Sequence, residues 1–318
     1  MRLCRYDSNG RALVGIYDER GVIPIETAAR AVSLAINADE ASDDPVDYLP
    51  PDGRFATEAR DLVQALETLD SDSRSRLMIP IGRVKLLVPT PRPTKILLLA
   101  GNYAAHVIER GGVAVERSET FPYVFMKPPT TTLTHPNDPV RIPNISPDHI
   151  DYEAELGVVI GKRCRHVDEA EALGYVAGYT VVNDITDRKY SPNPGRKPRE
   201  RDKFFDWLHG KWHDSFCPVG PCILSAEDLP DPQSLSIRLA VNGLVRQDGS
   251  TGQMIFPVAA VIAFLSQLVT LEPGDLISTG TPSGVGSSTG IYLKVGDEVV
   301  ASIGGIGNLR NPVTSQSL

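Results

Sequence analysis

Three acidic residues in the middle of the chain have the spacing of a metal site. Glu153 and Glu155 lie two positions apart at the start of an apolar stretch, and the period of a β-strand places both carboxylates on one face. Asp184 follows a second apolar stretch, where a strand would meet a loop. Carboxylate oxygens without Cys or His favour a hard cation, Mg²⁺ or Mn²⁺. The alternative is an exposed edge strand whose alternating acids bind no metal.

Short apolar segments surround these acids, and strands outnumber helices among them. Period-two patterns and turn residues such as Asn242-Gly243 indicate the strands, whereas longer apolar periodicity indicates the helices. We expect strands at 13–17, 22–25, 95–100, 123–127, 155–160, 175–182, 235–241, 244–247, 276–279 and 298–303, and helices at 56–69, 103–110, 168–173 and 257–268.

Alternating prolines suggest a division of the chain. Pro89, Pro91 and Pro93 form a stiff connector, because proline fixes φ and lacks an N–H for pairing. The pattern predicts a small N-terminal mixed α/β domain at 1–87 and a larger domain at 95–318. Within the larger domain, the stretch 191–206 is rich in Pro, Gly, Lys and Arg and is typical of a loop that covers an active site.

Composition excludes several classes of protein. The 318 residues carry a formal net charge of −8, which disfavours a general nucleic-acid surface. Four cysteines lack zinc-site spacing and indicate reduced thiols of a cytoplasmic protein. Since no apolar run approaches the ~20 residues that cross a bilayer, we expect no membrane partner. A small molecule is the expected ligand.

Several segments resemble motifs of the fumarylacetoacetate hydrolase family, in the family's order over roughly residues 95–313. The resemblance implies a β-rich α+β fold, in which a rolled mixed β-sheet domain follows a small N-terminal domain, and a homodimer. The matching segments are Asp151–Lys162, Val182–Arg188, Gly210–Trp212 with Phe216–Pro221, Met254–Phe256, Glu272–Asp275 and Thr279–Gly286.

The resemblance also implies a role for each matching residue of the metal motifs. Glu153, Glu155 and Asp184 would hold one Mg²⁺ or Mn²⁺ ion whose remaining positions take water or the substrate's carboxylate and keto oxygen. Lys211, which would otherwise be read as a surface lysine, would face the metal and stabilise an enolate or carbanion.

Five further residues are candidates for the chemistry. His106 and Glu109 stand at i and i+3 of an expected helix, so their side chains can meet. A lone helical histidine is more often structural, but here the pair resembles the family's His–Glu dyad, in which Glu109 would orient His106 as a general base. The resemblance also places Lys127, Arg188 and Thr281 against an anionic substrate, with simple structural pairing as the alternative.

These residues predict a divalent-metal-dependent hydrolase that cleaves a C–C bond in a β-diketo acid, such as an acylpyruvate or a fumarylacetoacetate-like compound. The same constellation could act as an oxaloacetate decarboxylase-like or a 2-hydroxyhepta-2,4-diene-1,7-dioate isomerase-like enzyme. A non-catalytic binder of small molecules would have lost the metal acids, the lysine or the dyad, and all are present. Asp187 and Lys189 depart from the family pattern, which leaves the substrate and the exact reaction open.

Overall fold

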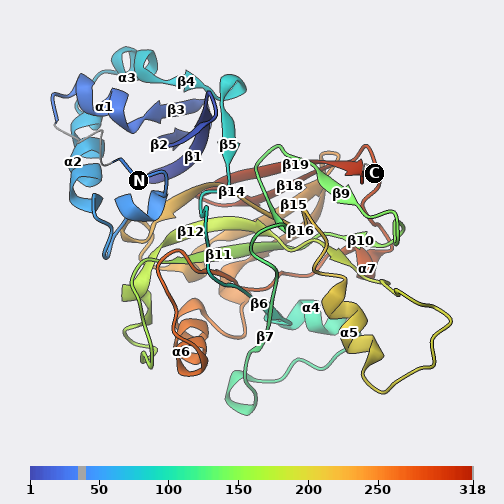
Figure 1. Ribbon diagram of the computed structural model, residues 1–318. Helices are drawn as coiled ribbons and strands as arrows, with labels where there is room; N and C mark the ends of the chain where they lie inside the picture. Colours follow the sequence, from blue (N-terminus) through green and yellow to red (C-terminus); the bar gives the residue numbers. More distant parts are fainter. Residues whose placement is uncertain (35–40, 317–318) are drawn as a thin grey trace.

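The computed structural model describes residues 1–34 and 41–316, and its N-terminal part contains antiparallel strands and several helices (Figure 1). Alternating apolar residues form its strands, and the helices cover them. The elements are β1 (Arg2–Ser8), β2 (Arg11–Asp18), β3 (Gly21–Pro24), α1 (Ile25–Ala31), α2 (Ala56–Glu67), α3 (Ser71–Leu77), β4 (Ile79–Pro80) and β5 (Lys85–Leu87).

The rest of the chain is rich in strands, as expected. Its elements are β6 (Ile96–Ala100), α4 (Ala104–Glu109), β7 (Tyr123–Met126), β8 (Leu133–Thr134), β9 (Val140–Ile142), β10 (Ile150–Asp151), β11 (Ala154–Ile160), β12 (Val176–Asn183), β13 (Thr186–Asp187), α5 (Asp202–His209), β14 (Cys217–Ser225), β15 (Ser236–Val241), β16 (Leu244–Ser250), α6 (Val258–Leu268), β17 (Leu276–Ser278), α7 (Gly286–Thr289), β18 (Glu298–Ile303) and β19 (Gly307–Ser315).

A large mixed sheet runs through the molecule in the order β4-β3-β2-β1-β14-β12-β11-β17-β6-β7. Its central strands β11, β12 and β14 are buried along their whole length, which explains why they read as continuous apolar runs. A second sheet, in the order β16-β15-β18-β19-β9, packs beside it (Figure 1). The fold is therefore β-rich α+β, as the sequence predicts.

The N-terminal strands continue the large sheet. β1 pairs with β14 in antiparallel register, with Leu3 opposite Ile223. One apolar core also joins the two segments, because Leu3 and Leu62 belong to the same buried cluster as Val182. The predicted boundary at 88–94 remains a prediction, and the segments on either side of it share a sheet and a core.

We expected the stretch 191–206 to be one long loop. Its last residues are instead helical, because α5 begins at Asp202. Acidic side chains at the start of α5 pair with the basic residues before it: Asp202 accepts from Arg196 at 3.1 Å and from the Arg199 backbone N–H at 2.8 Å. The helix expected at 168–173 is instead a 3₁₀ turn at Ala172–Tyr175. Within the described residues, no helix is long and apolar enough to cross a membrane.

Candidate active site

The carboxylate cluster of Glu153, Glu155 and Asp184 forms where two central strands meet. β11 and β12 are antiparallel neighbours, so the beginning of one lies beside the end of the other. The Asp184 backbone N–H donates to the Glu153 carbonyl at 2.9 Å, which ties the two ends together. All three side chains are buried, and one carboxylate oxygen of each lies within 4.8 Å of the others. The strand periodicity brings the acids together as expected.

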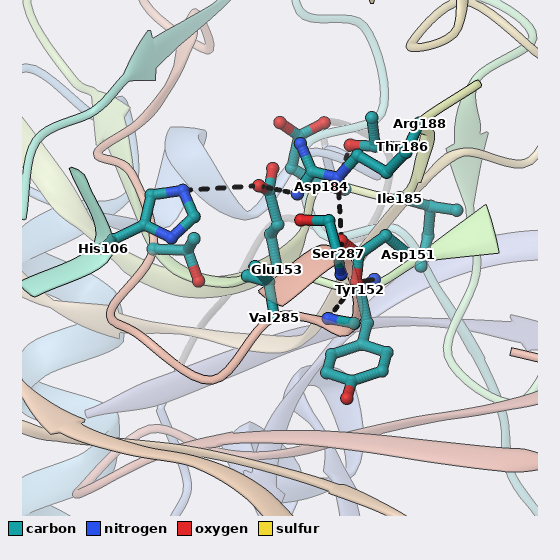
Figure 2. Close-up of polar contacts among 12 residues, drawn as sticks. His106, Asp151, Tyr152, Glu153, Asp184, Ile185, Thr186, Arg188, Val285 and Ser287 are labelled. Carbon is teal, nitrogen blue, oxygen red and sulfur yellow. Dashed lines mark hydrogen bonds and ion pairs between the residues drawn. The ribbon is translucent and has the colours of Figure 1, made fainter. Parts of the chain in front are cut away.

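The three cations that contact the carboxylate cluster are Lys211, Arg188 and Lys127. The Lys211 ammonium donates to Glu153 Oε2 and Thr186 Oγ1, both at 2.9 Å, and also contacts Asp184. Arg188 contacts Glu153 and donates through Nε to Asp151 Oδ2 at 2.7 Å (Figure 2). Burying each of these charges costs free energy of desolvation. The opposite charge beside it offsets that cost, which a buried charge without a partner would bear in full.

The buried charges shift the pKa values of two acids in opposite directions. Burial would raise the pKa of Glu153, but Arg188 and Lys211 outweigh it and hold that pKa well below its usual range. For Glu155, burial together with the Asp184 and Glu153 carboxylates raises the pKa to about 8. Glu155 is thus the acid with the least cationic compensation in the cluster.

The cluster fits a hard divalent cation. Ser278 Oγ at 2.6 Å and the Gly280 N–H at 2.9 Å both donate to Glu155 Oε2, and among the described residues no hydrogen bond reaches Oε1. A cation between Glu155 and its two acidic neighbours would remove the repulsion that raises the Glu155 pKa. The donor set is all oxygen, which suits Mg²⁺ or Mn²⁺.

Lys211 and Lys127 approach the cluster differently. The pKa of Lys211, which burial alone would lower, is raised by Asp184 and Glu153, so the ammonium stays charged in its buried position. Lys127 is also buried, and its ammonium lies 2.5 Å from Asp184 Oδ1 and 2.8 Å from the Ile185 carbonyl. It does not line the cavity described below, so its predicted contact with substrate remains a prediction.

The His106–Glu109 pair meets on α4 as its spacing predicts. His106 Nδ1 lies 2.8 Å from Glu109 Oε1, and the other Glu109 oxygen accepts the Gly284 N–H at 2.9 Å. This arrangement turns His106 Nε2 toward Glu153 Oε1, 3.9 Å away (Figure 2). That separation is too long for a direct hydrogen bond and is suited to a bridging water. The pair has the geometry of an oriented base beside the carboxylate cluster.

A small cavity of about 30 Å³ lies between the dyad and the carboxylate cluster. Its lining includes His106, Glu153, Glu155, Arg188 and Lys211, and its volume is sufficient for an ion with a water molecule. Thr281 also lines it. The Thr281 hydroxyl donates to the Ala154 carbonyl at 2.9 Å and accepts from Gln247 Nε2 at 2.8 Å, so a structural role accompanies its predicted contact with substrate.

Arg110 and Asp151 are site residues for which the sequence suggested no role. Arg110 directly follows the dyad, lines the same cavity and makes no ion pair or side-chain hydrogen bond to the described residues. Partial burial lowers the pKa of the Arg110 guanidinium, and repulsion by the nearby Arg188 lowers it further. Asp151 holds Arg188 and also accepts the N–H groups of Gly286 and Ser287. Asp151 stood in a recognised motif, whereas the position of Arg110 depended on where α4 docks.

The chain is similar to a known family and to several known proteins. The family described as fumarylacetoacetate (FAA) hydrolase C-terminal matches residues 95–314. The chain is 37% identical over 324 residues to a 2,4-didehydro-3-deoxy-L-rhamnonate hydrolase of Sphingomonas sp. (strain SKA58), covering 99% of this chain and 96% of that protein. It is 38% identical over 254 residues to a mitochondrial oxaloacetate tautomerase of Xenopus laevis, covering 79% of this chain and 74% of the relative.

The fold comparison extends over the whole chain. A probable 2-hydroxyhepta-2,4-diene-1,7-dioate isomerase of Mycobacterium abscessus superposes with a TM-score of 0.71 at 29% identity, and the match covers 100% of both chains. Hydrolase, tautomerase and isomerase names thus occur among similar proteins. The family match over more than half of the chain, together with the carboxylate cluster and the dyad, shows that this protein belongs to the fumarylacetoacetate hydrolase family.

Proposed function

We propose that the protein is a divalent-metal-dependent hydrolase that cleaves a C–C bond in a β-diketo acid of the acylpyruvate kind. The observation that carries this proposal is the His106–Glu109 pair. Glu109 orients the imidazole so that His106 Nε2 lies 3.9 Å from Glu153 Oε1 of the carboxylate cluster. The Sphingomonas relative supports it, because a 2,4-didehydro-3-deoxy acid has oxo groups at C2 and C4 flanking a methylene group. That arrangement is a β-diketo acid.

The dyad would activate water. With Nδ1–H donated to Glu109, the imidazole has its lone pair on Nε2, which takes a proton from a water in the small cavity. The resulting hydroxide adds to the carbonyl distal to the carboxylate. The bond between that carbon and the methylene carbon then breaks, which releases a carboxylic acid and the enolate of a 2-oxo acid. His106 returns its proton to the methylene carbon.

The charged residues would stabilise the enolate and hold the substrate. A divalent cation on Glu153, Glu155 and Asp184 would polarise the 2-oxo group as a Lewis acid. Lys211 adds a positive charge beside the carbon–oxygen system on which the negative charge develops. Arg110 has no protein partner among the described residues, and its guanidinium suits the substrate carboxylate.

The direct test follows the ultraviolet enol absorbance of acylpyruvates with Mg²⁺, with Mn²⁺ or with EDTA. We expect metal-dependent loss of absorbance and release of one carboxylic acid per pyruvate. Parallel assays follow decarboxylation and tautomerisation of oxaloacetate, since one relative is named for tautomerisation. Turnover of oxaloacetate without cleavage of any acylpyruvate would refute the hydrolase and favour proton transfer by the same dyad.

A further inference from the structure

A large apolar cavity lies beside the small polar one. Its volume is about 600 Å³, within the range of small-molecule pockets, and carbon-rich side chains form nearly all of its lining. Six aromatic residues make up what we call the aromatic wall: Phe121, Tyr123, Phe125, Phe204, Trp207 and Phe264. No charged side chain lines the cavity in the part of the chain that the structure describes.

The apolar cavity adjoins the reactive groups. Ala100, Phe125 and Trp207 line both this cavity and the small one, which Glu153 and Glu155 of the carboxylate cluster also line. The Lys211 ammonium lies 4.8 Å from the centre of the Phe125 ring and 5.7 Å from that of Trp207. The ring of Phe125 thus bounds the apolar cavity and also contacts the lysine of the carboxylate cluster.

Contacts between rings shape the aromatic wall. Phe125 and Trp207 meet edge to face with centroids 5.1 Å apart, and Phe121 stacks on Phe264 at 6.3 Å. The rings come from β7 and the segment leading into it, from α5 and from α6, which lie in the lower part of the molecule in Figure 1. Three elements distant in sequence therefore build one concave apolar surface.

We propose that this cavity binds an apolar tail of the substrate, the alkyl or aryl group attached to the carbonyl distal to the carboxylate. This inference rests on the proposed function, because a keto acid held at the carboxylate cluster directs its tail away from the metal. Burying an apolar tail removes its surface from water. A tail ending in a carboxylate would lose hydration without gaining a cation. The proposal therefore disfavours diacid substrates.

A second copy of the chain is the other occupant that an apolar face suggests. Two observations favour the substrate tail: the surface is a cavity of ligand size, and it shares walls with the small cavity beside Lys211. A flat contact between subunits requires neither. The experiment below includes the second copy as an outcome.

The test measures binding of 2-oxo acids to the Mg²⁺-loaded full chain by titration calorimetry. The series runs from pyruvate through 2-oxobutanoate and 2-oxohexanoate to 2-oxooctanoate, with 2-oxooctanedioate as the diacid of matching length. We expect the Kd to fall roughly threefold per added methylene once the tail reaches the cavity. We also expect the diacid to bind at least about tenfold more weakly than 2-oxooctanoate.

Leu268→Arg places a cation at the rim of the cavity without touching the carboxylate cluster. Leu268 is 57% exposed on α6, so the substitution is compatible with folding. The variant should bind pyruvate unchanged, lose the dependence on tail length and accept the diacid better. Leu244→Arg is the matched control, because Leu244 is 62% exposed on β16 and lies outside the cavity; it should behave like the unmodified protein.

Each result decides the proposal. An affinity that does not change with tail length overturns it. A Leu268→Arg variant that sediments as a monomer, yet keeps the dependence on tail length, also overturns it and assigns the apolar surface to a second copy of the chain. Absence of binding by every 2-oxo acid overturns both this inference and the proposed function. Binding that depends on the tail, without hydrolysis of acetyl-, hexanoyl- or benzoylpyruvate, supports the cavity and refutes the hydrolase. Hydrolysis with no preference among these acyl groups supports the hydrolase and refutes the binding of a tail in the apolar cavity.

Discussion

The carboxylate cluster and the aromatic wall are neighbours built on opposite principles. In the cluster, buried acids at the adjoining ends of two central strands each have two or more polar partners. The wall joins three elements through ring contacts, and Phe121 and Phe204 remain 60% and 54% exposed. Removing one charge of the cluster leaves its partners unpaired in a buried setting, so a substitution there should lower the free energy of unfolding even where the variant still folds. Because these side chains of the wall are largely exposed, exchanging them should cost little in folding stability.

This difference separates chemistry from selectivity. In the proposed reaction, the cluster would position the groups that every substrate needs, and its geometry depends on the pairing of β11 with β12. If the wall binds the tail of the substrate as proposed, changes there should alter which compound is used and leave the reaction intact. Four experiments at the polar end, ordered from the largest expected effect to the smallest, test how strictly that division holds.

The largest effect is expected from removing one charge of the carboxylate cluster. Asp184→Asn or Glu155→Gln should lower kcat by about 1,000-fold or more, because a catalytic metal contributes several kcal/mol of transition-state stabilisation. Calorimetric titration with Mn²⁺ should show loss of metal binding, while circular dichroism remains native. Asp248→Asn, at an exposed ion pair with Arg238, is the control and should be fully active. Full activity of the Asp184 variant would exclude the proposed metal site.

His106→Ala should lower kcat for hydrolysis by about 100- to 10,000-fold, the usual contribution of a general base. Metal affinity should change little, because His106 lies 3.9 Å from Glu153 and is not among the three acids. Glu109→Gln keeps the shape of the side chain that orients His106 and should lower kcat less than His106→Ala does. If His106→Ala removed metal binding to the same extent as activity, the histidine would be a ligand and the dyad assignment would be wrong.

Arg110→Gln should raise KM by about 10- to 100-fold with a small change in kcat, as expected for a lost charge-assisted hydrogen bond to the substrate carboxylate. Arg117→Gln is the matched control. Arg117 follows on the same segment but pairs with Glu169 and does not line the cavity. An equal KM for both variants would show that Arg110 makes no contact with substrate.

The smallest effect concerns the stability of metal-free protein. The folded-state pKa of Glu155 is raised from 4.5 to about 8, so between these values the folded protein holds a proton that the unfolded chain has released. This contribution to stability is present below pH 4.5 and is lost as pH rises toward 8. In EDTA, Tm should therefore fall by several degrees between pH 5 and pH 8, and Mg²⁺ should oppose the fall. Glu155→Gln should flatten the profile, and an unchanged slope would contradict the assignment.

Local periodicity made the carboxylate cluster predictable. Two acids at i and i+2 of a strand share a face whatever the fold, and a strand ending in an acid presents it at the sheet's edge. The dyad was predictable for the same reason, because i and i+3 meet on a helix. The strands at 155–160 and 175–182 followed from apolar runs that only a buried strand explains, and β11 and β12 confirm them.

Features made by distant segments were not predictable in this way. The chain gives no sign that Arg110 lines the cavity of the carboxylate cluster, since that depends on the docking of α4. The pairing of β1 with β14 joins residues more than 200 positions apart and crosses the expected boundary at 88–94. The start of α5 at Asp202 was concealed by a run of basic residues whose acidic partners lie within the helix itself.

The sequence by itself determined the candidate groups: which carboxylates share a face, which histidine has a carboxylate one turn away, and which family motifs occur in order. Only the tertiary structure decided the surroundings, including the compensation of Glu153 but not Glu155 and the apolar cavity formed by β7, α5 and α6. The physical reason is the distance along the chain over which each effect acts. Periodicity acts over one turn or one strand, whereas burial, charge compensation and cavities depend on which distant segments come to lie together.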